Sequence, residues 1–161
     1  MEVEMKIRGL MVDPVTNMPI IVLRQADGDA VLPIWVGVFE ANAIAFEIEK
    51  ATPPRPMTHD LIRNLVLGFD AVVHKVVVTE LRDDTFFAVI WVERHGAMLS
   101  FDSRPSDALA LALRTDCPIF VDESVLKTSR LSTMANERVS PEDLKRWLEN
   151  LGDEDLGRYK M

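Results

Sequence analysis

Hydrophobic and polar residues alternate along the first part of the chain. Residues 2–12 carry an apolar side chain at nearly every second position, with charged residues between them, which is the period of a half-buried strand. Residues 18–25 and 30–37 are rich in aliphatic and β-branched side chains, and Asp27 and Gly28 lie between them. Because Asp-Gly is a strong hairpin signal, the pattern predicts a three-stranded meander.

After residue 37 the apolar spacing becomes helical. Residues 38–50 predict a helix packed on the sheet, and the prolines of residues 51–57 end it, because proline removes a backbone donor. A second helix is predicted from Thr58, as its N-cap, to Gly68. Its expected inward-facing residues are Leu61, Ile62 and Leu65.

The middle of the chain is rich in β-branched and aromatic residues. Residues 70–81 and 85–96 predict a long hairpin, followed by a shorter strand at 97–102. Both faces of residues 71–78 are apolar, which is typical of a central strand covered on both sides.

The run of alanine and leucine that follows predicts a helix at about 104–115, because both residues are strong helix formers. Leucines lie on opposite sides of this helix, so we expect it to be buried all round. A short strand is predicted at residues 117–121.

The last part of the chain has a weaker pattern. Residues 127–139 have mixed polarity and predict a loop, whereas residues 140–151 predict a helix that packs on its own domain or on a second subunit. We therefore expect one compact domain over residues 1–130 and a C-terminal loop and helix over residues 131–161. The predicted fold class is α/β (α+β), with a mixed, largely antiparallel sheet flanked by helices.

Composition changes this picture mainly through charge. The 161 residues are 48% hydrophobic and 27% charged, with a mean hydropathy of +0.06, as in a globular protein. A net charge of -8 and a pI near 4.9 repel phosphate backbones on average, so binding of nucleic acid must be local. The single cysteine, Cys117, excludes an internal disulfide, and we interpret it as a buried hydrophobic residue.

The sequence contains no signal of a membrane or secretory segment. The N-terminus lacks an apolar core, and no later stretch approaches the roughly 18 apolar residues of a membrane span. We therefore expect a cytoplasmic protein that does not associate with membranes.

Candidate chemistry is confined to polar residues near predicted helix starts, because no glycine-rich phosphate loop, paired-cysteine zinc pattern or H-E-x-x-H motif is present. Glu40 lies in a first helical turn, where the dipole stabilises a carboxylate with or without a function. The same two interpretations, stabilising a helix start or taking part in function, apply to Thr58, His59 and Asp60. His59 is the best-placed general acid or base, because imidazole titrates near neutral pH.

Residues 102–107 gather further polar groups in front of the alanine- and leucine-rich helix. Ser103 or Ser106 is expected to cap the helix, with Pro105 in its first turn and Asp107 facing its dipole. Arg104 opposes the dipole, so it needs a partner. That partner is either an acid, Asp102 or Asp107, or a bound phosphate that the guanidinium grips with two hydrogen bonds.

Four separated motifs, in this order, closely resemble the bifunctional nuclease family. They are "LPIWVGVFEANAIAFEIE" (32–49), "RPMTHDLI" (55–62), "TFFAVIWV" (85–92) and "DSRPSDALALALRTDCPIFV" (102–121). The resemblance covers about residues 1–130. It implies a compact α/β domain with a mixed sheet, a tendency to form homodimers, and hydrolysis of both RNA and DNA. The matching motif residues are Glu40, Arg55, Thr58, His59, Asp60, Asp102, Arg104, Ser106 and Asp107.

The resemblance suggests a nuclease that cleaves RNA and DNA with little sequence specificity. The expected catalytic residues are His59, Asp60, Glu40 and Asp107. The expected substrate-binding residues are Arg104, Ser106, Arg55 and Thr58. Asp102 and Asp107 are candidate ligands for Mg2+ or Mn2+, since hard cations take carboxylate oxygens. The alternative is a non-catalytic module that binds an anion or assembles into a homo-oligomer.

Overall fold

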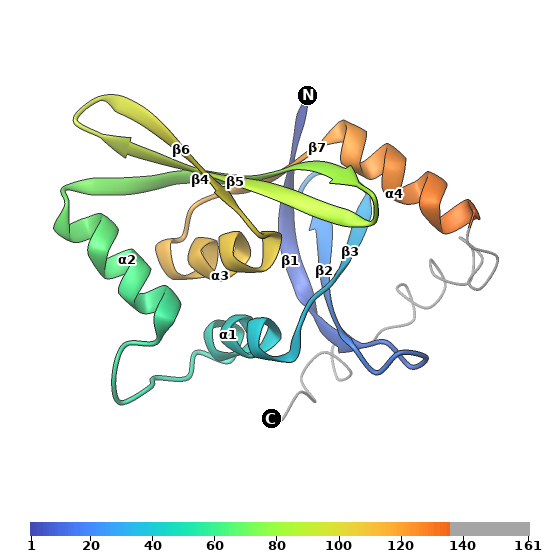
Figure 1. Cartoon of the computed structure of the whole chain (residues 1–161), viewed down its shortest axis with the longest axis horizontal. Coiled ribbons are helices and arrows are strands. Elements are labelled where there is room, and N and C mark those ends of the chain that lie inside the picture. Colours follow the sequence, from blue (N-terminus) through green and yellow to red (C-terminus); the bar gives the residue numbers. More distant parts are fainter. Residues whose placement is uncertain (136–161) are drawn as a thin grey trace.

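The computed structural model describes residues 1–135, which form a seven-stranded mixed sheet with four helices (Figure 1). The predicted fold class is confirmed. The strands are β1 (Glu2–Val12), β2 (Pro19–Gln25), β3 (Val31–Trp35), β4 (Ala71–Arg82), β5 (Thr85–Arg94), β6 (Ala97–Ser103) and β7 (Ile119–Asp122). The helices are α1 (Val38–Ile48), α2 (Thr58–Gly68), α3 (Pro105–Thr115) and α4 (Glu123–Ala135).

The short strand β7 joins two antiparallel halves into one sheet of order β3-β2-β1-β7-β4-β5-β6. The first half is the predicted meander, and the second is the predicted β4–β5 hairpin with β6 added. β7 pairs with β1 in antiparallel and with β4 in parallel orientation. Residues Val76–Val78, where β4 pairs with β7, are buried on both faces as predicted, whereas Val72 is exposed.

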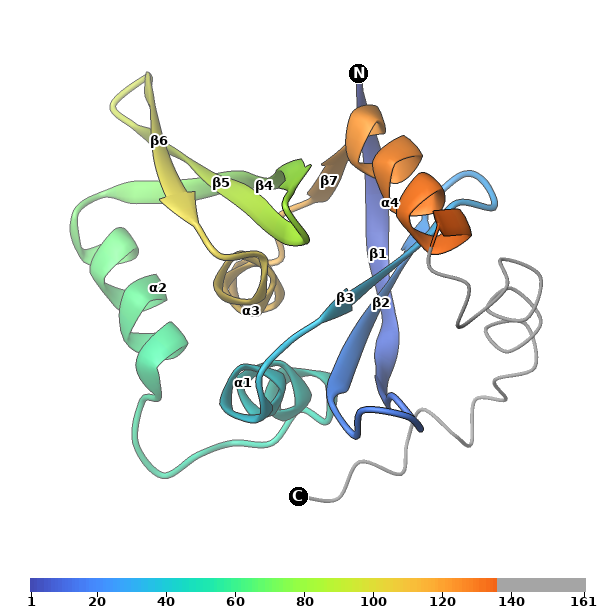
Figure 2. The same cartoon turned by 45° about the vertical axis from the view of Figure 1, so that its right-hand side comes forward.

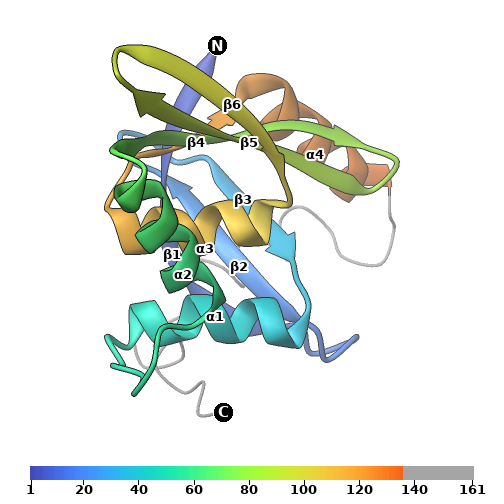
Figure 3. The ribbon, with the colours of Figure 1, turned by 60° about the vertical axis from the view of Figure 1, so that its left-hand side comes forward.

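Helices α1, α2 and α3 lie on one side of the sheet and α4 lies on the other (Figures 2 and 3). α3 is the central helix, because it contacts α1, α2, β4 and β5. Its alanines and leucines from Ala108 to Ala112 are almost fully buried, which confirms the prediction of a helix covered all round. The small alanine side chains let the neighbouring helices approach closely, and this places the starts of α1, α2 and α3 near one another.

The orientation of α2 differs from the prediction. Ile62 packs against the core as predicted, but Leu61 and Leu65 are 53% and 51% exposed, while His59 and Asp60 are buried. The helix turns this polar side inward because both side chains have charged partners on α3. The N-cap is Met57 rather than Thr58.

The loop predicted at residues 127–139 is wrong as far as residue 135, because α4 extends from Glu123 to Ala135. Val125 and Leu126 of this helix are buried on the sheet. The mixed polarity of the segment is therefore that of a helix with one covered face. The helix predicted at residues 140–151 lies outside the described residues, as does most of the predicted C-terminal segment 131–161.

The two edges of the sheet are unlike. β3 carries Pro33 and is largely buried, whereas β6 is exposed along nearly its whole length, including Met98, Leu99 and Phe101. Proline on an edge strand hinders pairing with another chain. The predicted homodimer stays a prediction.

Within residues 1–135, no helix is long and apolar enough to cross a membrane.

Candidate functional site

Four side chains from three helix starts form one chain of ion pairs and hydrogen bonds, called here the polar network: Glu40, Arg104, Asp107 and His59. Arg104 Nη1 donates to Glu40 Oε1 at 2.9 Å and Arg104 Nε donates to Asp107 Oδ2 at 2.9 Å. His59 Nε2 lies 2.9 Å from Asp107 Oδ1. Residues 64 positions apart in the sequence are thereby in direct contact.

Arg104 is the N-cap residue of α3 and its side chain is 65% exposed. Its partners are Asp107, three residues later in α3, and Glu40 of α1. These two carboxylates offset the positive charge of Arg104, which opposes the helix dipole. Asp107 first, and then Glu40, raises the pKa of Arg104. Neither serine caps the helix, contrary to the prediction, because α3 has no side-chain cap hydrogen bond and Ser103 Oγ donates to the Arg104 carbonyl.

Asp107 links the two halves of the network. Burial alone would raise the pKa of Asp107, but hydrogen bonds from Arg104 and His59 lower it below its ordinary value. An ionised carboxylate only accepts hydrogen bonds, so His59 Nε2 must carry the proton it donates. The lone pair of the neutral imidazole is then on Nδ1, and this nitrogen has no hydrogen-bond partner among the described residues.

Gly37, the N-cap residue of α1, makes room for the carboxylate of Glu40. A Cβ atom at this position would overlap Glu40 Oε2, although the backbone φ of -71° suits any residue. The absence of a side chain therefore matters for space and not for backbone strain. It allows Glu40 to fold back beside its own helix start, where it meets Arg104.

A second, buried ion pair lies beside the network. Asp60 Oδ2 accepts from the Met57 backbone N–H at 2.9 Å, and Asp60 Oδ1 accepts from Arg114 Nε at 3.0 Å. Burial raises the pKa of Asp60, but these two hydrogen bonds and the charge of Arg114 lower it overall. Arg114 was missed by the sequence analysis. The available signal was a lone cation directly after the apolar run of residues 108–113.

The remaining predicted site residues are not part of the network. Arg55 and Thr58 are exposed, and neither side chain makes a hydrogen bond or ion pair within residues 1–135. Ser106 is buried in the first turn of α3, and Asp102 is exposed on β6. Their predicted roles in binding substrate or metal stay predictions.

A Mg2+ or Mn2+ ion at the polar network would need several oxygen ligands from its carboxylates. Among residues 1–135, no three His, Cys, Asp or Glu side chains are grouped closely enough to hold one. Glu40 and Asp107 already accept from a guanidinium, which competes with a cation for the same oxygens. As arranged, these residues do not fit a bound Mg2+ or Mn2+.

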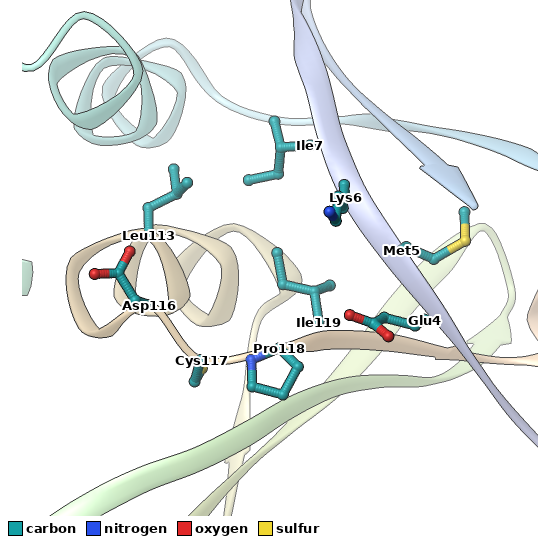
Figure 4. A pocket seen from close by; sticks show the side chains of 9 residues that line it. All are labelled: Glu4, Met5, Lys6, Ile7, Leu113, Asp116, Cys117, Pro118 and Ile119. Carbon is teal, nitrogen blue, oxygen red and sulfur yellow. The ribbon is translucent and has the colours of Figure 1, made fainter. Parts of the chain in front are cut away.

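An open pocket of about 380 Å3 lies at the opposite end of α3 (Figure 4). It contains no residue of the polar network and is lined by Glu4, Met5, Lys6, Ile7, Leu113, Asp116, Cys117, Pro118 and Ile119. Burial raises the pKa of the Cys117 thiol, so little reactive thiolate forms at neutral pH. Cys117 was predicted to be a buried hydrophobic residue; it packs against the core but is only half-buried, because it also lines this pocket.

Comparison with known proteins finds a family and several relatives. The family model described as "Bifunctional nuclease domain" matches residues 21–134. Uncharacterized protein Rv1829 of Mycobacterium tuberculosis is 37% identical over 162 residues, covering 95% of this chain and 97% of the relative. Bifunctional nuclease 1 of Arabidopsis thaliana is 27% identical over 126 residues, and Bifunctional nuclease 1 of Oryza sativa subsp. japonica is 26% identical over 118 residues. These alignments cover 76% and 71% of this chain but only 39% and 36% of the plant proteins.

Proposed function

The chain belongs to the bifunctional nuclease domain family, and from that premise we propose that it hydrolyses phosphodiester bonds of RNA and DNA with little sequence preference. The observation that carries the proposal is the pairing of an imidazole and an exposed guanidinium with one carboxylate, Asp107. A general base and an anion-binding group are thus held next to each other.

Arg104 is the proposed phosphate-binding residue. A guanidinium has five N–H donors, of which the pairs with Asp107 and Glu40 use only part. Its exposed side chain leaves Nη2 free to donate to a phosphodiester oxygen. The backbone N–H groups at the start of α3 add a favourable dipole for an anion.

His59 is the proposed general base. Its Nδ1 takes a proton from a water molecule while the water oxygen forms a bond to phosphorus and the bond from phosphorus to the leaving oxygen breaks. The proton then returns to the leaving oxygen, directly or through solvent. Because water is the nucleophile, the reaction does not require a 2′-hydroxyl, and this accounts for action on both RNA and DNA.

The proposed contacts and the charge of the chain favour weak binding of nucleic acid with low sequence specificity. The proposed contacts are to phosphate oxygens, which carry no base information, and the net charge of -8 disfavours a long bound nucleic acid. The polar network itself holds two carboxylates against one guanidinium. We therefore infer weak binding through few phosphates.

The first test is cleavage of RNA and single-stranded DNA by purified Arg104→Ala and His59→Ala. Each variant is expected to lose about 10²-fold in rate, since an anion-binding donor and a general base each contribute on that order. Arg24→Ala is the matched control, because Arg24 is an exposed arginine outside the network. Variants that cut as fast as the parent would assign the activity to a contaminant or to another site. Parallel assays with EDTA and with Mg2+ test the expectation from the sequence that Mg2+ or Mn2+ takes part, which the arrangement of the network does not favour.

A non-catalytic module is the competing function, and one observation favours it: every charged group of the polar network already has a partner within the network. In that case the purified parent would show no cleavage that depends on Arg104 or His59, and Arg104→Ala would lower the melting temperature or dissociate an oligomer. Melting temperature and solution mass, measured on the same variants, separate the two functions.

A second prediction concerns Glu40, whose carboxylate accepts a hydrogen bond from Arg104 Nη1. A bound phosphate would otherwise use this donor. In a His59→Ala background, which prevents turnover, Glu40→Gln is expected to bind a short DNA oligonucleotide about two- to fivefold more tightly. This range follows because an exposed ion pair is worth up to about 1 kcal/mol. Isothermal titration calorimetry measures the change.

Gly37→Ala is the companion variant. The added Cβ displaces the Glu40 carboxylate from Arg104 but keeps its charge, so tighter binding in both variants identifies occupancy of Arg104 as the cause. Unchanged or weaker binding in both would show that Glu40 does not compete with phosphate.

A further inference from the structure

A buried guanidinium connects the three helices that carry the polar network. The Arg114 side chain is 1% exposed. Its Nε donates to Asp60 Oδ1 of α2 at 3.0 Å, and its Nη2 donates to the Ala43 carbonyl of α1 at 3.0 Å. In its own helix, α3, Nη1 donates to the Ala110 carbonyl at 2.8 Å. One planar group thus binds α1, α2 and α3 at once.

Each partner of Arg114 is close in sequence to a residue of the network. Ala43 follows Glu40 by three residues in α1, and Ala110 follows Asp107 by three residues in α3. Asp60 is the direct neighbour of His59 in α2. Because each helix moves as one rigid element, a shift of α1 or α2 against Arg114 shifts Glu40 or His59 relative to Arg104 and Asp107 on α3.

Stability alone does not account for this arginine. Taking a charge out of water is costly, and well-packed apolar residues often serve a core equally well or better. Leucine and alanine fill the buried positions from Ala108 to Ala112 in the middle of α3. A guanidinium at this place supplies what an apolar residue cannot, namely three directional contacts in a fixed plane.

We propose that Arg114 is a positioning residue of the site, which holds α1 and α2 against α3 so that Glu40 and His59 meet Arg104 and Asp107. The inference rests on the proposed nuclease function. Arg114 acts through Asp60 and through two backbone carbonyls, and within residues 1–135 it makes no hydrogen bond or ion pair with a residue of the network. Asp60 is accordingly assigned a supporting role, in place of the catalytic role expected for it from the sequence.

The test is Arg114→Lys, which keeps the charge but replaces the planar fork by a single ammonium group. We expect kcat to fall about 10- to 100-fold, since a displacement of about 1 Å at a reacting group can cost 10²-fold. KM is expected to change less than about threefold, because Arg104 is carried by α3 itself. The Nε2 proton of His59, observed by 15N-edited NMR, is expected to lose the signal of its hydrogen bond to Asp107.

Val22→Ala is the matched control for general destabilisation. Val22 is buried in a small cluster with Met11 and Ile20, separate from the main core. This variant is expected to lower the melting temperature but to keep the parental kcat and the His59 signal. If Arg114→Lys does not fold, Asp60→Asn provides the same test, because it removes the charged partner of Arg114 while keeping an amide oxygen as acceptor.

The outcomes separate this inference from the proposed function. A parental kcat and an unchanged His59 signal in Arg114→Lys would overturn the positioning role, even if His59→Ala is inactive. A parent protein without nuclease activity would overturn the proposed function. The NMR signal would then still decide whether Arg114 holds His59 against Asp107.

Discussion

Asp107→Asn is expected to lower kcat for phosphodiester cleavage by about 10³-fold or more, the largest loss of activity for any single change in the polar network. The reason is that both working groups depend on this carboxylate. One oxygen of Asp107 accepts from His59 and the other accepts from Arg104, each at 2.9 Å. The single change therefore affects a general base and an anion-binding donor, each worth about 10²-fold or more.

Asparagine cannot replace this pair of acceptors. It presents one oxygen and one NH2 group, so a donor must face either the protonated Nε2 of His59 or the guanidinium of Arg104. If the NH2 group faces His59, the imidazole is driven to the other tautomer, which removes the lone pair from Nδ1. If it faces Arg104, the guanidinium loses one of its two carboxylate partners, the one that contributes most to its raised pKa.

Single-turnover cleavage of a fluorescent oligonucleotide measures the effect without interference from product release. The double variant Asp107→Asn with His59→Ala provides the control, since residues that act as a unit give losses that do not add. We expect the double variant to be about as slow as Asp107→Asn alone. A single variant that retains parental kcat within about threefold would show that the carboxylate does not organise the chemistry.

Secondary structure was predictable wherever the hydrophobic residues of a segment followed a single period. The alternating segment of β1 and the β-branched hairpin of β4 and β5 bury one or both faces, and such patterns are visible in a single sequence. α4 was missed because the apolar residues of this segment, such as Val125 and Leu126, lie among many polar neighbours. This segment is helical because it covers one face of the sheet, and that tertiary contact is not visible in a single sequence.

The candidate site was predictable in its members but not in its connections. The polarity of residues 102–107 identified Arg104 as a cation in need of a partner, and Asp107 was one of the acids considered. The contact with Glu40 depends on how α1 packs against α3, which no local pattern contains. α2 was misoriented for the same reason: hydrophobicity favours burial of Leu61 and Leu65, but the ion pair and hydrogen bond to α3 draw Asp60 and His59 inward.

Asp60→Asn is expected to lower the free energy of unfolding at pH 7 by about 3 kcal/mol, the largest loss of stability among these variants. Removing one member of a buried ion pair costs roughly 3 to 5 kcal/mol, because the remaining charge is left without compensation. Arg114 would be that charge, with only the more distant carboxylate of Glu47 at 3.8 Å. For a chain of this length the melting temperature should fall by roughly 6 to 12 °C.

The loss should depend on pH in a direction that the pKa of Asp60 determines. Although burial raises it, the hydrogen bonds from Met57 and Arg114 bring the native pKa of Asp60 below its ordinary value. A carboxyl group whose pKa is lowered on folding stabilises the native state fully above its unfolded value of about 3.9, and this stabilisation disappears as pH falls through the native value. Asparagine does not titrate, so the difference between parent and variant should be largest near pH 7 and should shrink below about pH 4.

Urea unfolding of both proteins at pH 7, 5, 4 and 3 measures this difference directly. Asp13→Asn is the control, because the pKa of Asp13 is also lowered but its side-chain partner is the neutral Trp35 indole, and its expected cost is below about 1.5 kcal/mol. A difference for Asp60→Asn that stays constant from pH 7 to pH 3 would mean that the carboxylate charge is not what stabilises α2 against α3. The orientation of His59 would then have to depend on packing of α2 alone, and Arg114→Lys would leave the His59 hydrogen bond intact.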